Sequence, residues 1–153
     1  MMEHELFDLL SKEEKIIQSL IASAKQKQSV IIQNDYEALN NVNAGESSLL
    51  SELDNVSRNQ QKLVSRLFEI NAIKENGKPR VLPILINDFK EIFNPNQLKK
   101  INELRLSIRD QVKILTGLNH QNRFMIEHAS SLVKETISLL LKSRKTSLID
   151  RKV

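Results

Sequence analysis

Cysteine and tryptophan are absent from this 153-residue sequence, and glycine and proline occur only three times each. Without cysteine, disulfides and thiolate metal sites are excluded. Few helix breakers and an aromatic content of 4% favour a mostly helical chain. No stretch reaches the roughly 18 continuous apolar residues of a membrane span, so no transmembrane segment is expected. We expect no signal peptide either, because Met2-Glu3-His4-Glu5 is acidic where a signal is basic. A cytoplasmic helical protein is therefore expected.

The sequence also lacks the residue groupings that catalysis and cofactor binding require. The three histidines, His4, His120 and His128, are too far apart in sequence to form a helical metal-binding pair. The glycines are equally scattered, so no glycine-rich loop can cradle a phosphate. Glu127 precedes His128, but adjacent residues diverge on a helix. We therefore expect no enzyme, no metal and no cofactor.

The net charge of +4 is unevenly distributed along the chain. Residues 1–60 contain 5 Lys/Arg against 10 Asp/Glu, whereas residues 61–153 contain 18 against 9. Part of the basic excess lies in residues 142–153, which are predicted to be a frayed tail after a single helical domain over 1–141. A basic tail can bind nucleic acid or anionic lipid. Without interleaved aromatics, however, nucleic-acid binding is not expected.

The strongest periodic signal predicts a helix from about Asn94 to Leu141. Asn94-Pro95-Asn96-Gln97 combines an Asn N-cap, Pro at the first helical position and Gln at the third. The apolar residues that follow recur every three or four positions, as in a coiled-coil heptad: Ile101, Leu104, Ile108, Leu115, Leu118, Met125, Leu132 and Leu139. Gln111, Asn122 and Thr136 interrupt the series. A helix this long needs partners to cover its apolar stripe.

Two further long helices are predicted, with a break near Gly45. The first runs from about Glu5 to Asn43 on a wide apolar stripe. The second, from about Glu46 to Ile73, has a narrow seam of Leu49, Leu53, Val56, Gln60, Leu63, Leu67 and Ile70. Glycine ends helices readily because it accepts the left-handed conformation. A continuous helix with a tolerated glycine is the alternative.

Residues 75–80 predict a loop, because they combine Gly77, Pro79 and several charges. The dense apolar run that follows predicts a short helix from about Pro83 to Phe93, packed as a plug against the other helices. A strand over 81–86 would have no partner strand. The fold prediction is an all-α, elongated antiparallel helical bundle or coiled coil with three long helices and one short helix.

The second half of the last helix is the candidate binding region. Asn122 lies on the heptad seam and Asn119 flanks it. Either both face solvent at a thin part of the bundle, or they offer side-chain amides to a partner helix. Beyond them the apolar face continues, including Met125, an adaptable residue at helix-binding surfaces. The simplest alternative is that this stripe is structural core.

Two stretches of the sequence match the motifs of one protein family. Asn34-Asp35-Tyr36-Glu37-Ala38-Leu39 is similar to a D-x-x-x-L turn that precedes a Leu-rich second helix in that family. Leu118-Asn119-His120-Gln121-Asn122-Arg123-Phe124-Met125-Ile126 is similar to the family's L-N-x-x-N-x-x-L-I signature, with Met125 where Leu is usual. With these motifs, and with the short apolar segment before the last helix, nearly the whole chain resembles the FlgN family of flagellar export chaperones.

The resemblance implies a chaperone that binds the helical ends of hook–filament junction proteins of the FlgK and FlgL type. Such a chaperone prevents premature assembly of its clients and delivers them to the export gate. A partly uncovered apolar helix face fits this role as a helix-in-groove receptor. The predicted client-binding residues are Leu118, Asn119, Asn122, Met125, Ile126, Ala129, Leu132, Val133, Thr136, Ile137 and Leu140.

Two other classes of function stay open from the sequence. The same stripe could be buried by a second copy, which would make the protein a self-associating coiled-coil adaptor without a client. The basic half could instead make a nucleic-acid or membrane-surface helix, whose binding would be sensitive to salt. A homo-oligomer is compatible with either of the first two hypotheses.

Overall fold

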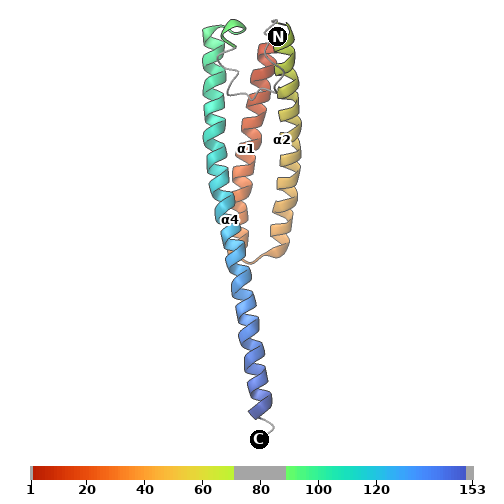
Figure 1. Cartoon of the computed structure of the whole chain (residues 1–153), viewed down its shortest axis with the longest axis vertical. Coiled ribbons are helices and arrows are strands. Elements are labelled where there is room, and N and C mark those ends of the chain that lie inside the picture. The colour runs from red at the N-terminus through yellow and green to blue at the C-terminus, as the bar shows by residue number, and fades with distance from the viewer. Residues whose placement is uncertain (1, 71–88, 151–153) are drawn as a thin grey trace.

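The computed structural model describes residues 2–70 and 89–150. Its elements are α1 (Met2–Ile32), α2 (Tyr36–Ile70), the 3-10 helix η1 (Phe89–Glu91) and α4 (Pro95–Asp150). In Figure 1, α2 runs antiparallel to α1, and α4 runs parallel to α1. Within the described residues there are helices and no strands, which confirms the all-α prediction and its three long helices. The predicted loop over 75–80 lies outside this part of the chain.

α1 is the central helix and packs against both α2 and α4. The wide apolar stripe predicted for the first helix explains this position, since one helix must cover two neighbours. The main core cluster takes buried residues from every described element: Leu6, Leu10, Ile17, Leu63, Val64, Leu67, Phe89, Phe93, Ile101 and Ile108. A smaller cluster of Ile16, Leu20 and Val56 continues it between α1 and α2.

The break between the first two helices falls at Gln33–Asp35, so the predicted helix to Asn43 with a break at Gly45 is wrong. Asn34 adopts a left-handed backbone with φ of 55°. Its N–H donates to Ile31 O at 3.1 Å and the Asp35 N–H donates to Val30 O at 3.2 Å, which together form a Schellman C-cap. The Asp35 carboxylate then caps α2 by accepting the Ala38 N–H at 3.0 Å.

Gly45 lies inside the continuous helix α2, as the alternative prediction allowed. A Cβ at this position would meet no atom within 4 Å, so no close packing requires the glycine. The hydrogen bonds of the caps at residues 33–35 therefore decide where the helix breaks. A glycine inside a helix costs only about 1 kcal/mol, so α2 continues through Gly45. The heptad seam predicted for the second helix faces the core through its buried residues Val56, Gln60, Leu63 and Leu67.

The described end of the predicted short helix is η1, and its residues 83–88 lie outside the described part of the chain. Phe89 is fully buried and Phe93 is 3% exposed. Their rings meet edge to face with centroids 5.1 Å apart. These two phenylalanines close the core cluster at the end of the bundle where α4 begins.

The start of α4 is the predicted capping box. The Gln97 N–H donates to Asn94 Oδ1 and the Asn94 N–H donates to Gln97 Oε1, both at 2.9 Å. The helix contains 56 residues, or about 84 Å at 1.5 Å per residue. It ends at Asp150 rather than at Leu141, because no glycine or proline follows Gly117 and a helix can outlast its apolar period. Fraying of residues 142–153 stays a prediction.

Candidate functional site

The feature that sets α4 apart is that α1 covers only its first half. The polar contacts between these parallel helices join residues 93 to 98 positions apart in sequence. The end of α1 at Ile32 is therefore level with the part of α4 near Met125, and the two residues line one shallow hollow. Beyond this level no other helix of ranges 2–70 and 89–150 lies beside α4 (Figure 1). Every residue from Ser131 to Lys145 is exposed.

In the covered half, polar residues on the α4 seam find partners on α1. Gln111 Nε2 donates to Glu14 Oε1 at 3.0 Å, and Ser107 Oγ donates to the same carboxylate oxygen at 2.6 Å. On the other side of α1, Gln60 Nε2 of α2 donates to Glu13 Oε2 at 2.6 Å. Polar pairs inside an apolar interface favour one register, because a shift would leave buried polar groups without partners.

Asn122 is the last of these seam contacts. Its side chain is 3% exposed, and Nδ2 donates to the Ala24 carbonyl oxygen of α1 at 2.9 Å. The partner helix of the Asn122 amide is therefore α1 of the same chain, so of the two alternatives for this residue exposure to solvent is wrong. Asn119, by contrast, is exposed. Leu118 and Met125 are half-buried beside Asn122.

The other seven predicted residues lie on the same face of α4, at and beyond the end of α1. Ala129 is half-buried at this boundary, and the next heptad position, Thr136, is exposed and donates its hydroxyl to Leu132 O at 2.8 Å. The large apolar residues around them are each about half exposed or more, from 42% to 65%: Ile126, Leu132, Val133, Ile137 and Leu140. We call these seven residues the uncovered face. Leu139 and Leu141, also exposed, widen it.

A cleft of about 330 Å³ opens where the uncovered face meets the turn between α1 and α2. One wall is formed by Ile126, Ala129, Ser130, Val133 and Lys134 of α4. The opposite wall is formed by Val30, Ile31, Asn34, Asp35, Tyr36 and Leu39. Tyr36 is 68% exposed. The sequence prediction missed this opposite wall, although the D-x-x-x-L motif marks the turn that forms it.

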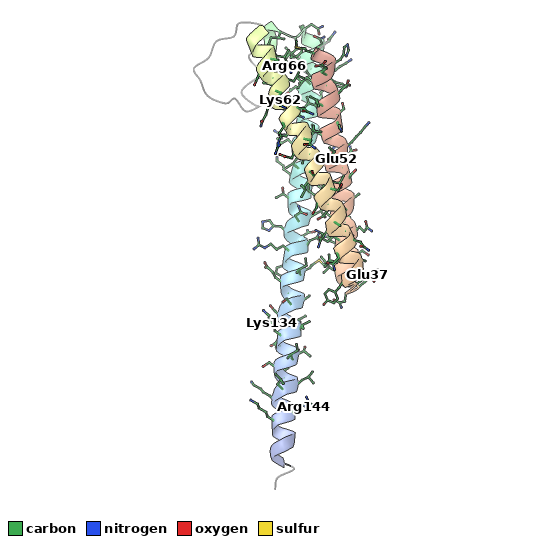
Figure 2. The ribbon with its side chains drawn as sticks, turned by 90° about the vertical axis from the view of Figure 1, so that its right-hand side faces the viewer. Glu37, Glu52, Lys62, Arg66, Lys134 and Arg144 are labelled. Carbon is green, nitrogen blue, oxygen red and sulfur yellow. The ribbon has the colours of Figure 1, made fainter. Side chains whose placement is uncertain are left out.

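The charges beside the uncovered face are mostly basic. Lys134 and Arg144 are exposed and have no ion pair among the described side chains. Lys134 and Arg144 are labelled on this part of α4 in Figure 2. Arg123 differs, because Glu127 accepts a hydrogen bond from its Nε at 2.9 Å. That bond raises the pKa of Arg123, and the carboxylate offsets its charge locally.

Other kinds of site are not found in the described ranges 2–70 and 89–150. No group of three or more His, Asp or Glu side chains is close enough there to hold a metal ion. His128 instead stacks on Phe124 with ring centroids 6.0 Å apart. None of the helices described combines the length and the apolar character needed to cross a membrane. The uncovered face and its cleft are therefore the candidate site.

The fold is a helical bundle whose longest helix presents an exposed apolar face, and large exposed apolar patches are typical of interaction surfaces. The family model described as FlgN protein matches residues 1–149. The chain belongs to the FlgN family, a family of chaperones in flagellar assembly and export. Searches among curated proteins and among solved structures found no match.

Proposed function

We propose that this protein is a cytoplasmic flagellar export chaperone that binds the helical end segments of hook–filament junction proteins of the FlgK and FlgL type on the uncovered face of α4. Binding would keep the client from assembling early and would deliver it to the export gate. The observation that carries the proposal is the uncovered face itself, which continues the α1-covered seam beyond the end of α1.

The energetics support a helical client of modest size. Leu132, Val133, Ile137 and Leu140 are each 51% to 65% exposed and would be buried by a helix lying alongside. Burial of one side chain of this size contributes about 1.5–3 kcal/mol. Because the four side chains are only about half exposed in the free protein, together they contribute roughly 3–6 kcal/mol, and apolar side chains of the client must supply the rest of the binding free energy.

The test compares two double substitutions on the same stretch of α4. In each variant the two substituted positions are seven residues apart. Val133→Asp with Leu140→Asp places two carboxylates at the centre of the uncovered face. Ser131→Asp with Ser138→Asp places the same two charges on the opposite side of α4, because the positions differ by roughly half a turn. Each of the four residues is exposed, so both variants should fold.

Calorimetry with C-terminal segments of the hook–filament junction proteins from the same bacterium measures the result. We expect the Val133/Leu140 variant to lose binding and the Ser131/Ser138 variant to retain it. Equal affinity of both variants for these segments would exclude the uncovered face as the client site. Light scattering of the free protein addresses the competing adaptor hypothesis, for which a stable dimer that excludes the segments is the expected result.

A further inference from the structure

None of the residues that line the cleft between α4 and the turn joining α1 to α2 belongs to either core cluster. We infer that this cleft is an anchor pocket for one bulky apolar side chain of an acidic amphipathic helix lying along the uncovered face. The inference rests on the proposed function only in placing a partner helix on that face. It adds the position of the anchor and the charge of the partner.

The size and lining of the cleft fit an apolar side chain. Its volume of about 330 Å³ far exceeds the ~30 Å³ share of one water molecule. Ile31, Leu39, Ile126 and Val133 contribute apolar surface from both walls. Asp35, the acidic residue of the lining, already accepts the Ala38 N–H as the cap of α2.

The position of the cleft gives it a role in register. α1 still covers Asn122, and Ala129 lies one heptad further along α4. A partner helix on the uncovered face cannot extend past this level, because the α1–α2 turn occupies the space. Its end therefore meets the cleft, and a large side chain there would fix how far along α4 the partner lies.

The charge of the uncovered half indicates the charge of the partner. Residues 128–145 include four basic residues against one acidic residue, Glu135. By helical spacing Arg144 lies on the uncovered face and Lys134 near its edge, whereas Lys142 and Lys145 lie on the side of α4 that Ser138 occupies. Basic residues near the end of a helix offset its macrodipole only within about the last turn. Lys134 lies 16 residues before Asp150, so this explanation does not extend to it. Acidic flanks on a partner helix would complement these charges, whereas a second copy of the same segment would repel them.

The cleft-filling variant Ala129→Phe tests the anchor pocket. The added ring should occupy the cleft from the α4 wall and leave the fold intact, as checked by thermal unfolding. Ser138→Phe is the control, because it adds the same ring to an exposed position on the opposite side of α4. Tyr36→Ala is a second variant, which removes an exposed part of the other wall with little risk to folding.

The probe is a synthetic amphipathic helix of about three heptads, with one Phe at the end of its apolar stripe and Glu on both flanks. We expect Ala129→Phe to weaken its binding about tenfold in calorimetry, Tyr36→Ala to weaken it less, and Ser138→Phe to leave it unchanged. A peptide with Ala in place of the Phe should bind the wild type and Ala129→Phe alike. A peptide with Lys flanks should bind the wild type at least about tenfold more weakly at low salt.

The failures of the two proposals are distinguishable. If the wild type binds none of these peptides, or if Ala129→Phe binds the Glu-flanked peptide as the wild type does, the anchor pocket is overturned. If Ala129→Phe prevents binding of that peptide, but the junction-protein segments bind neither the wild type nor this variant, the anchor pocket is supported and the client assignment fails. If the Lys-flanked peptide binds as well as the Glu-flanked one, the proposed charge of the partner is wrong.

Discussion

The two halves of α4 carry the same heptad pattern, but among the residues that the structure describes only the first half has a partner helix. In the covered half, Ile101 and Ile108 are buried and Asn122 bonds to α1. In the uncovered half, the corresponding seam position Thr136 bonds only to its own helix, and Leu140 is 65% exposed. A heptad pattern therefore shows that a helix face needs a partner, and the lengths of the neighbouring helices decide whether the same chain supplies it.

The largest difference between the halves should appear when one apolar side chain is truncated in each. Ile101→Ala removes a 3% exposed side chain from the main core cluster and should lower the free energy of unfolding by about 2–5 kcal/mol. Leu140→Ala should change it by less than about 0.5 kcal/mol, because the side chain already faces solvent. Urea denaturation measures both. A large loss for Leu140→Ala would show that the uncovered half is packed in solution.

A smaller difference should separate the polar seam residues. Asn122→Ala removes the hydrogen bond to Ala24 O from a buried site and should destabilise the protein by about 1–2 kcal/mol. Thr136→Ala should be neutral or slightly stabilising, because alanine has the higher helix propensity at an exposed position. Thermal unfolding of the two variants measures the contrast. Equal stability of both variants would mean that the Asn122 contact contributes nothing to the packing of α1 on α4.

The smallest effect is expected from removing the end of the uncovered half. Deletion of residues 142–153 should leave the Tm nearly unchanged, because residues 142–145 are exposed and the apolar period ends at Leu141. The same deletion should weaken binding of the Glu-flanked peptide, since it removes the positive charges of Arg144 and Lys145. Differential scanning calorimetry and peptide titration measure the two outcomes. A marked drop in Tm would indicate that this basic segment packs.

Signals that act between neighbouring residues were readable from the sequence. The sequence predicts the Asn94–Gln97 capping box and the all-α class, and both are present in the described residues. The first helix break was placed at Gly45 by its residue type, yet the cap formed by Asn34 and Asp35 ends α1 eleven residues earlier. Glycine only permits a break, whereas the Schellman motif and the N-cap satisfy backbone groups that a break exposes.

The sequence by itself determined the helices and the apolar face of α4, because helical hydrogen bonds and the spacing of apolar residues depend only on residues a few positions apart. Only the tertiary structure decided which part of that face is free. The bond from Asn122 to Ala24 joins residues 98 positions apart, and no local pattern states where α1 will end against α4. The same is true of the cleft, whose walls come from two distant segments. How much of the α4 face is covered depends on how whole helices pack, and that packing is decided by many contacts together.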